Sequence, residues 1–372
     1  MPNKLRRFTK KAFIVCNVII ALLFLLACLA PYLNPAKWWL ISFLGFGFVI
    51  LLVIIFLFIF FWLILSPRYV FISIVALLIG WKSISVFFAF NTPRQFKYEK
   101  YPGEIRVVSW NVARFIEIIK NSNKGSQVRL KMMDLIKNQN ADILCLQEFH
   151  TSTNPKYYDN IEYIQHELNY PYFYFSYDED GDRLYYSSII FSRYPIIDSG
   201  VIHYPKPSIT DALIFADIKF NRDTIRVYTT HLQSLQFKKE DYRKIEEIKN
   251  QEDSMIENSR TIFYKLKRAI THRSLQANII KKLFADSPYP ILFCGDLNDV
   301  PNSYTYFTIR GNMQDAFLQK GFGIGRTFTG LSPTLRIDYI LTSKDFSIQQ
   351  VNRIVKNYSD HYMILSDVKL KQ

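Results

Sequence analysis

Six short polar clusters lie at the ends of apolar runs and carry side chains that are suited to chemistry rather than to packing. In chain order they are Ser109-Trp110-Asn111, Leu146-Gln147-Glu148, Thr230-His231-Leu232, Gly295-Asp296-Leu297-Asn298, Arg336-Ile337-Asp338-Tyr339 and Ser359-Asp360-His361. Asp, Asn and His at strand ends contribute little to a core, but their side chains hold phosphate groups and hard divalent cations well. Together the clusters predict a site that holds a phosphoester beside a metal ion and hydrolyses it.

The first two clusters supply the predicted metal ligands, Asn111 and Glu148, each of which follows an apolar run. Mg2+ prefers oxygen ligands and keeps several waters, so one amide oxygen and one carboxylate, completed by substrate phosphate, suit it. Mn2+ is the alternative ion, and Asp360 is expected to bind the metal or to support a ligand. A strand-end Asn by itself more often caps a turn, and Glu148 by itself is equally ambiguous, so the prediction depends on the later clusters.

The later clusters supply the predicted acid–base groups. Asp296 and Asn298 are two residues apart on a turn that leaves an apolar run, so both side chains can reach one pocket. Asp296 is expected to accept a proton from an attacking water, and Asn298 to donate to a phosphate oxygen. His231 and His361 are expected to donate to the charge that develops on the phosphate, with Asp338 orienting His361 through a ring nitrogen. Each motif alone is as compatible with an ordinary turn or a structural histidine.

The N-terminal quarter of the chain is apolar. Runs over residues 13–30, 38–65 and 69–90 carry almost no charge, and each approaches or exceeds the ~20 residues that cross a bilayer. Trp38, Trp39, Trp62 and Tyr69 lie near the run ends, as in an aromatic belt, and Lys82 interrupts the third run. We therefore predict a bundle of about three transmembrane helices within residues 1–92. A cleaved signal peptide that ends in the lipoprotein-like Leu25-Leu26-Ala27-Cys28, or a buried soluble helix pair, is the alternative.

The positive charge is concentrated at the N-terminal end. The chain has a net charge of +14 and a pI of about 9.4, of which residues 1–100 contribute +10 and the remainder only +4. The high pI therefore does not by itself indicate nucleic acid binding. Under the positive-inside rule, a basic N-terminus inside and three crossings place the rest of the chain outside the cytoplasm. The expected location is a bacterial inner membrane, with the catalytic part in the periplasm; two crossings would reverse this orientation.

After a polar linker over residues 93–103, residues 104–372 have the alternating pattern of an α/β domain. Strands are predicted at 105–110, 142–147, 172–176, 187–192, 196–203, 213–219, 224–230, 289–295, 336–342, 348–355 and 361–368, and helices at 127–138 and 158–168. Hairpins are indicated by Asp180-Gly181-Asp182 and Asn221-Arg222-Asp223. A helical insertion is predicted over about 233–284. It is either a solvated helix with internal charge pairs or a basic face toward an anionic substrate or lipid headgroups.

The order of the six clusters resembles the endonuclease/exonuclease/phosphatase superfamily with the DNase I-like fold, over about residues 106–368. The resemblance implies a four-layer α/β/β/α sandwich of two mixed sheets, with the site at one edge. It implies Mg2+ binding at Asn111 and Glu148, water activation at Asp296 and phosphate contacts from Asn298. By the same resemblance, His231 and His361 face the phosphate, Asp338 is the histidine partner, and Asp360 is the acid next to it.

Three departures from the family's DNA-repair members argue against a repair role. The residues after Asn111, Val112 and Ala113, lack the Gly-containing signature of abasic-site endonucleases, and the helical insertion and membrane anchor are unusual. The expected function is a membrane-anchored, metal-dependent phosphodiesterase or nuclease. The alternatives are a sphingomyelinase-like phosphoesterase acting on phospholipid or inositol phosphate, and a catalytically inactive membrane scaffold. No protein partner is indicated.

Overall fold

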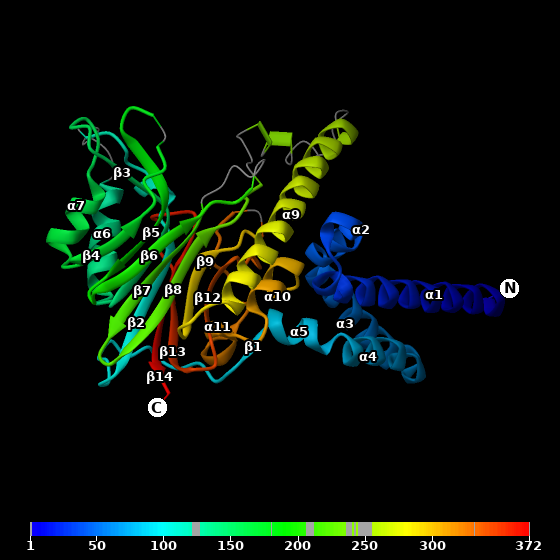
Figure 1. The fold of residues 1–372 in the computed structure, drawn as a ribbon. Helices are drawn as coiled ribbons and strands as arrows, with labels where there is room; N and C mark the ends of the chain where they lie inside the picture. Colours follow the sequence, from blue (N-terminus) through cyan, green and yellow to red (C-terminus); the bar gives the residue numbers. More distant parts are fainter. Residues whose placement is uncertain are drawn as a thin grey trace. The chain divides into compact units, whose positions relative to one another are not determined.

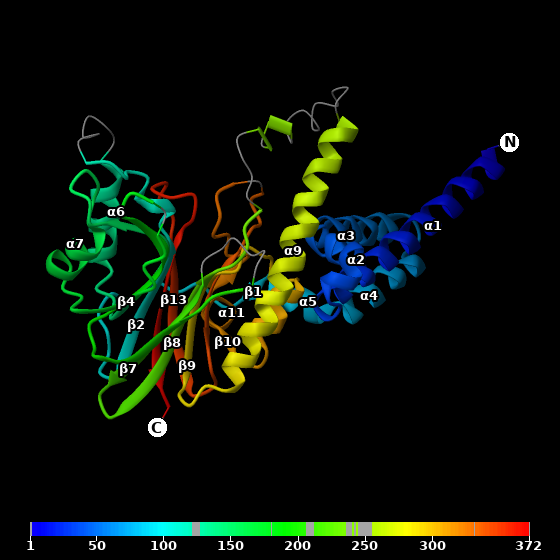
Figure 2. The same ribbon diagram turned by 45° about the horizontal axis from the view of Figure 1, so that its top comes forward.

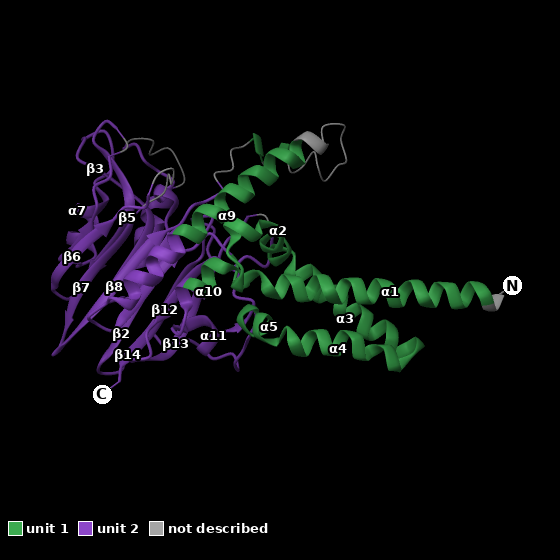
Figure 3. Ribbon diagram, turned by 45° about the vertical axis from the view of Figure 1, so that its right-hand side comes forward, with its two compact units in different colours: residues 1–87, 237–275, 300–308 green, residues 88–236, 276–299, 309–372 purple. Residues whose placement is uncertain are grey.

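The computed structural model of the 372-residue chain describes residues 2–120, 127–179, 181–205, 212–235, 240–241, 243–244, 255–330 and 332–371. The chain divides into two compact units (Figure 3). Unit 1 comprises Met1–Phe87, Phe237–Leu275 and Val300–Thr308, and unit 2 comprises Phe88–Gln236, Gln276–Asp299 and Ile309–Gln372. The predicted domain boundaries, at residue 92 after the transmembrane region and at residue 103 after the linker, stay a prediction.

Unit 2 is built on two six-stranded sheets (Figure 1). The first sheet has the order β13-β14-β2-β3-β5-β4 and the second has the order β10-β12-β9-β8-β7-β6. The strands of the first sheet are β2 (Glu104–Asn111), β3 (Ile143–Ser152), β4 (Tyr172–Phe175), β5 (Leu184–Ser192), β13 (Phe346–Ile354) and β14 (Met363–Leu370). Those of the second are β6 (Ile196–Ile202), β7 (Leu213–Phe220), β8 (Asp223–His231), β9 (Ile291–Asp296), β10 (Gln314–Asp315) and β12 (Asp338–Thr342).

The side chains of β2 show why the sheets stack into layers. Val108 and Trp110 join the core beneath α6 (Val128–Asn138) and α7 (Asn160–Glu167), whereas Ile105 and Val107 join the core between the two sheets. This alternation follows from the two-residue period of a strand, which sends neighbouring side chains to opposite faces. Figure 2 shows α6 and α7 on the outer face of the first sheet.

The second sheet is covered by the C-terminal part of α9 (Met255–Ala285), whereas α11 (Ala316–Lys320) places Ala316 in the core between the two sheets. Within α9, the ring of Phe284 packs 5.0 Å from that of Tyr228 on β8 and 5.5 Å from that of Phe293 on β9. Helix, sheet, sheet and helix therefore form the four-layer sandwich that the sequence predicted.

Two parallel strand pairs determine where the functional side chains gather. β2 is parallel to β3 in the first sheet, and β8 is parallel to β9 in the second. Because parallel neighbours run in the same direction, the end of β2 at Asn111 lies beside Gln147 of β3, and the end of β8 at His231 lies beside the end of β9 at Asp296. β4 pairs with β5 and β7 pairs with β8 in antiparallel fashion, as the two predicted hairpins require.

Several short elements of unit 2 were not predicted. They are β1 (Ala89–Phe90), which pairs with β11 (Phe322–Gly323), and also β10 and α11. Sequence periodicity is uninformative over two to five residues, because so short a segment contains no full repeat of the apolar pattern. These elements form through pairing with distant residues, as when Ala89 pairs with Gly323.

Unit 1 contains the apolar helices. They are α1 (Pro2–Leu29), the short η1 (Ala30–Tyr32), α2 (Pro35–Phe46), α3 (Phe48–Leu65), η2 (Pro67–Tyr69), α4 (Val70–Ile79) and α5 (Trp81–Phe87). Two helical segments of the described chain, Lys4–Tyr32 and Phe48–Leu65, are long and apolar enough to cross a membrane. A third crossing is formed if Pro67–Ile79 and Trp81–Phe87, bent by 66°, are taken as one span.

The second expected span, residues 38–65, is wrong in its extent. The helix breaks at Gly47, and only α3 is a span by itself, while Pro35–Phe46 forms the separate helix α2. Residues 38–65 are apolar throughout, so hydropathy does not mark a break. Gly47 interrupts the helix without interrupting the apolar pattern.

Contacts within unit 1 fix the directions of its helices. The stacked ring pairs Phe13–Phe61 and Phe24–Phe48 make α3 antiparallel to α1. α4 returns parallel to α1. Lys10 Nζ of α1 donates to the hydroxyl of Ser66, just before η2, at 2.8 Å, and farther along α1 the Asn17 side-chain oxygen accepts from the hydroxyl of Ser73 on α4 at 3.0 Å. The chain thus runs up, down and up again through the bundle.

The first part of the predicted insertion packs on these helices. Phe263 of α9 stacks on Phe43 at 4.8 Å and meets Trp39 edge-on at 5.2 Å. This segment is therefore held by an aromatic cluster on α2 rather than forming a freely solvated helix. Residues 245–254 of the insertion lie outside the described residues.

A buried ion pair that joins the neighbouring strands β2 and β14 offers a test of the fold. Arg106 Nε and Nη2 donate to the two carboxylate oxygens of Asp367 at 2.7 and 2.8 Å, and both side chains are completely buried. Asp367→Ala leaves an uncompensated buried cation and is expected to lower the free energy of unfolding by about 3–5 kcal/mol. The exposed Asp345→Ala is the control for chemical denaturation of the purified chain. Equal small losses in both variants would contradict a structural role for the pair.

Candidate active site

Three neighbouring strands of the second sheet carry functional residues at the same edge of the sheet. His231 is the last residue of β8, Asp296 the last of β9 and Asp338 the first of β12. The ladder pairs His231 with Asp296 and Asp296 with Asp338 as direct neighbours. Clusters far apart in the sequence are thus brought side by side by strand register.

The first sheet contributes Asn111 at the end of β2 and Glu148 within β3. The Asn111 amide donates to Glu148 Oε1 and to Asp296 Oδ2, both at 3.1 Å, so it links the two sheets. The pairing of β3 with β5 shifts between Leu146 and Phe149, and Glu148 has a φ of 49°. This bulge turns the Glu148 carboxylate out of the alternating strand pattern and toward Asn111.

Asp296 is the centre of the arrangement and is completely buried. Its Oδ2 lies 3.7 Å from His231 Nε2 and 3.6 Å from His361 Nε2, and its Oδ1 accepts the backbone N–H of Asn298 at 2.8 Å. Burial and then the charge of Asp338 raise the pKa of Asp296, while the two histidines act in the opposite direction. A carboxylate with a raised pKa is suited to accepting a proton from water.

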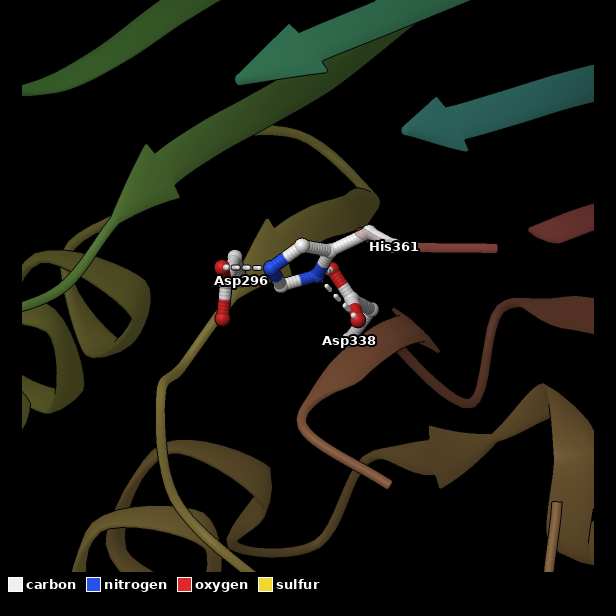
Figure 4. A group of neighbouring side chains, drawn as sticks. All are labelled: Asp296, Asp338 and His361. Atoms are coloured by element: carbon white, nitrogen blue, oxygen red, sulfur yellow. Dashed lines mark hydrogen bonds and ion pairs between the residues drawn. The ribbon is translucent and has the colours of Figure 1, made fainter. Parts of the chain in front are cut away.

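His361 and Asp338 form a buried pair. His361 Nδ1 lies 3.0 Å from Asp338 Oδ2, and Figure 4 shows the ring between Asp338 and Asp296. Burial disfavours the charged ring, but the charges of Asp338 and Asp296 and the hydrogen bond with Asp338 raise the pKa of His361 to about 10. His361 is therefore an imidazolium at neutral pH, a cation that can donate from Nε2. The indole of Trp110 holds this segment by donating to the His361 carbonyl at 2.9 Å.

The raised pKa of His361 predicts that the metal-free protein loses stability as the pH rises from 6.5 to about 10. The folded state binds this proton more tightly than the unfolded state. The contribution of His361 is therefore complete below its unfolded pKa and is lost as the pH rises through its folded pKa. Asp338→Asn removes a charge that raises the pKa and should make the loss smaller. Thermal unfolding with a chelator across this interval is the measurement, and identical pH profiles for both proteins would contradict the assignment.

Two residues that were predicted to bind phosphate or metal, Asn298 and Asp360, make other contacts. The Asn298 amide donates to the Leu232 carbonyl at 2.9 Å, and its φ is 51°, so it braces the turn after Asp296. Asp360 is exposed, and its carboxylate accepts from Ser359 Oγ at 3.2 Å. It is not one of the carboxylates that meet around His361. The phosphate role of Asn298 and the metal role of Asp360 stay predictions.

Two residues that sequence reasoning did not single out support the site. Thr327 Oγ1 accepts the backbone N–H groups of Ile337 and Asp338 at 2.9 and 3.1 Å, which fixes the start of β12. The ring of Phe328 lies 4.9 Å from that of His361. A Thr-Phe pair in a loop has no chemical signature of its own, so only the proximity of these residues to the site identifies them.

The donor set fits a hard divalent cation. Asp296, Asp338 and His361 place ligand atoms within 4.8 Å of one another, although His361 Nδ1 is already paired with Asp338 Oδ2 at 3.0 Å. The Glu148 carboxylate, which accepts from Asn111, is the better donor, since Mg2+ prefers oxygen. The Asn111 side-chain oxygen accepts the backbone N–H of Ala113 at 3.1 Å, so the ligand role of Asn111 stays a prediction.

A left-handed turn begins at Ala113, two residues after Asn111. Ala113, Arg114, Phe115 and Ile116 have φ values of 44°, 56°, 56° and 64°, although none is glycine. Each such residue is costly for an L-amino acid. The guanidinium of Arg114 lies 4.1 Å from the ring of Tyr186, which helps to hold the turn. Sparsely populated backbone conformations of this kind concentrate at functional sites.

Comparison with known proteins identifies the family of the chain. The model of the Endonuclease/Exonuclease/phosphatase family matches residues 108–361, a range that contains every site residue named above. Residues 10–87 match a domain of unknown function, DUF8431. No curated protein matches the sequence.

Solved structures share the fold at low identity. An endonuclease/exonuclease/phosphatase from Beutenbergia cavernae DSM 12333 has a TM-score of 0.51 and 18% identity, covering 72% of this chain and 72% of that one. A humanized TDP2 from D. rerio has a TM-score of 0.50 and 17% identity, covering 72% of this chain and 99% of that one. Because the family model spans more than half of the chain, the protein belongs to the endonuclease/exonuclease/phosphatase family and is a phosphoester hydrolase.

Proposed function

We propose that the protein is a membrane-anchored, divalent-metal-dependent phosphodiesterase or nuclease. One observation carries the proposal: the buried Asp296 carboxylate lies between His231 and His361, at 3.7 and 3.6 Å, and His361 is paired with Asp338. This arrangement combines a proton acceptor with positively polarised donors. Hydrolysis of a phosphoester by water needs both.

Asp296 accepts the proton of the attacking water. As the water oxygen bonds to phosphorus, the bond from phosphorus to the ester oxygen breaks, and that oxygen leaves as an alcohol after taking up a proton. Negative charge grows meanwhile on the phosphate oxygens, and the Nε2–H of the charged His361 donates to them. His231 Nε2 donates from the other side of Asp296. Donors already oriented in a buried site need no rearrangement during the reaction, and each typically contributes several kcal/mol. Asn298 holds the turn that orients Asp296.

Glu148, with Asn111 beside it, is the residue that would hold the metal, which leaves Asp296 to act as the base. When bound, Mg2+ or Mn2+ neutralises charge on the phosphate oxygens and makes bound water more acidic. The Glu148 side chain is half-buried, 28% exposed, so solvent reaches this position.

A phospholipid or inositol phosphate is the second candidate substrate, and the apolar helices favour it. Two helices of the described chain are long and apolar enough to cross a membrane, which would keep the site close to lipid. Residues after Lys100 carry a net charge of only +4, a weak electrostatic basis for nucleic acid binding.

The deciding experiment assays the purified full chain on bis-(p-nitrophenyl) phosphate with Mg2+, Mn2+ or EDTA. Metal-dependent turnover is expected, and its absence would indicate an inactive scaffold. A panel of plasmid DNA, RNA, sphingomyelin and inositol phosphates then identifies the substrate class.

We also propose that the catalytic unit lies outside the cytoplasm, in the periplasm if the host is Gram-negative. The up, down and up course of α1, α3 and α4 supports an odd number of crossings, and Lys10 and Arg68 both lie over Tyr69 at the N-terminal end of the bundle. Basic residues at one end favour the cytoplasmic side. A reporter fused after Gln372 is the test. Alkaline phosphatase should be active, and green fluorescent protein exported by the general route should be dark. The opposite pattern would refute this orientation without affecting the chemistry.

A further inference from the structure

An apolar groove lies within unit 1, between α1 and the bend that joins α4 to α5. It has a volume of about 300 Å³, at the lower end of the ~300–1,000 Å³ typical of small-molecule sites. Leu22, Leu26 and Leu29 of α1 form one wall. Ile79 of α4 and Lys82 of α5 line the other. The groove is therefore hydrocarbon-lined with one cation at its edge.

The bend at Gly80 shapes this groove. A Cβ at Gly80 would lie 2.5 Å from the ring of Phe24 and 2.9 Å from Cys28 Sγ, so glycine is needed for this close approach. The close approach allows α5 to turn away from α4 by 66°. Lys82 follows the bend directly and is thereby positioned at the mouth of the groove.

Aromatic rings hold the ammonium group of Lys82 without cancelling its positive charge. Its ammonium lies 5.2 Å from the ring centroid of Tyr32 and 5.9 Å from that of Phe307. In the part of the chain that the structure describes, it forms no ion pair with a carboxylate. Aromatic faces attract a cation without cancelling its charge, so the ammonium remains available to an anion.

The surroundings of Lys82 correspond to the headgroup level of a bilayer. Tyr32, Trp38 and Trp81 are 50%, 52% and 57% exposed at the end of the bundle that is opposite Lys10, and exposed Trp and Tyr mark the membrane–water interface. Leu22 and Leu29, 55% and 45% exposed, line the groove on the side of the hydrocarbon. An occupant must therefore be apolar along α1 and anionic beside Lys82.

We propose that this groove binds one anionic phospholipid of the bilayer, with an acyl chain along α1 and the headgroup phosphate at Lys82. A zwitterionic lipid presents the same chain but no net charge, so the site is selective for anionic lipid. The proposal goes beyond hydrolysis, because the groove is built from unit 1 and contains none of the catalytic residues.

The test reconstitutes the full chain into phosphatidylcholine nanodiscs with a small fraction of a probe lipid that carries a photoactivatable group on its acyl chain. The probe has either a phosphatidylglycerol or a phosphatidylcholine headgroup, and labelled peptides are quantified by mass spectrometry. The phosphatidylglycerol probe should label α1 and α5 about fivefold more than the other probe, the effect of one basic residue near an anionic lipid.

Lys82→Gln should abolish this preference, and Lys82→Arg should retain it. The matched control is Lys37→Gln, which removes an exposed lysine outside the groove and should leave the preference intact. Leu26→Trp fills the groove and should reduce labelling by both probes. Turnover on bis-(p-nitrophenyl) phosphate should be unchanged in each variant, since Lys82, Lys37 and Leu26 have no catalytic role.

Three results would overturn the proposal. They are equal labelling by the two probes in the native chain, a preference that survives Lys82→Gln, and a loss of preference in Lys37→Gln as large as in Lys82→Gln. The last result would mean that general surface charge, rather than the groove, attracts the lipid. Release of the native chain from membranes by alkaline carbonate would overturn it as well.

Discussion

Replacement of Asp296 by asparagine is expected to lower the rate of phosphoester hydrolysis by about 10²–10⁴-fold, the contribution typical of a positioned general base. The side-chain oxygen of the variant can still accept the N–H of Asn298, now 2.8 Å from Asp296 Oδ1, and only the bond from Asn111 to Oδ2 is lost, because an amide nitrogen cannot accept it. An amide cannot take a proton from water under these conditions. The effect should therefore appear in the rate and not in the fold.

The measurement is turnover of bis-(p-nitrophenyl) phosphate at saturating Mg2+, with thermal unfolding as the control for structure. Asp286→Asn, at an exposed position, is the matched control and should behave like the native chain. His361→Ala should also nearly abolish turnover, and the double variant should be little worse than either single one, since groups that act in one step are not additive. Fully multiplicative losses would show that Asp296 and His361 serve different steps.

The layer architecture was predictable because its signals are local. β2 was expected at residues 105–110 and occupies Glu104–Asn111, since a short apolar run can be recognised without knowing its partners. The break at Gly47 was not predictable, because residues on both sides are equally apolar. The insertion was ambiguous for another reason: whether a charged helix is solvated or packed depends on distant aromatic residues such as Trp39 and Phe43.

The residue types of the site were predictable, but their arrangement was not. The sequence marks His231, Asp296 and Asp338 as strand-end polar residues, and strand register alone makes them neighbours. Register is a non-local property, set by pairing between segments far apart in the chain. The left-handed turn that begins at Ala113 was equally hidden, because no glycine marks it.

Glu148→Gln is expected to lower metal-dependent turnover at least about 100-fold, since even the loss of a residue that only supports a metal ligand costs ~10–100-fold. The charge is the essential difference, because a neutral amide is a poor ligand for a hard cation. The fold should tolerate the change. The side-chain oxygen of the introduced glutamine can still accept from Asn111, as Glu148 Oε1 does at 3.1 Å, and the side chain at this position is partly open to water.

Two readouts separate a lost metal from a damaged site. Binding of Mn2+, followed by electron paramagnetic resonance without any substrate, should weaken in Glu148→Gln. It should be unchanged in the control Glu162→Gln, which alters an exposed carboxylate on α7. Raising the Mg2+ concentration should restore part of the lost turnover, because a weakened site still fills by mass action. If Glu148→Gln bound Mn2+ with native affinity and kept the native rate, Glu148 would not be a metal ligand, and Asp296 with Asp338 would become the carboxylates to test next.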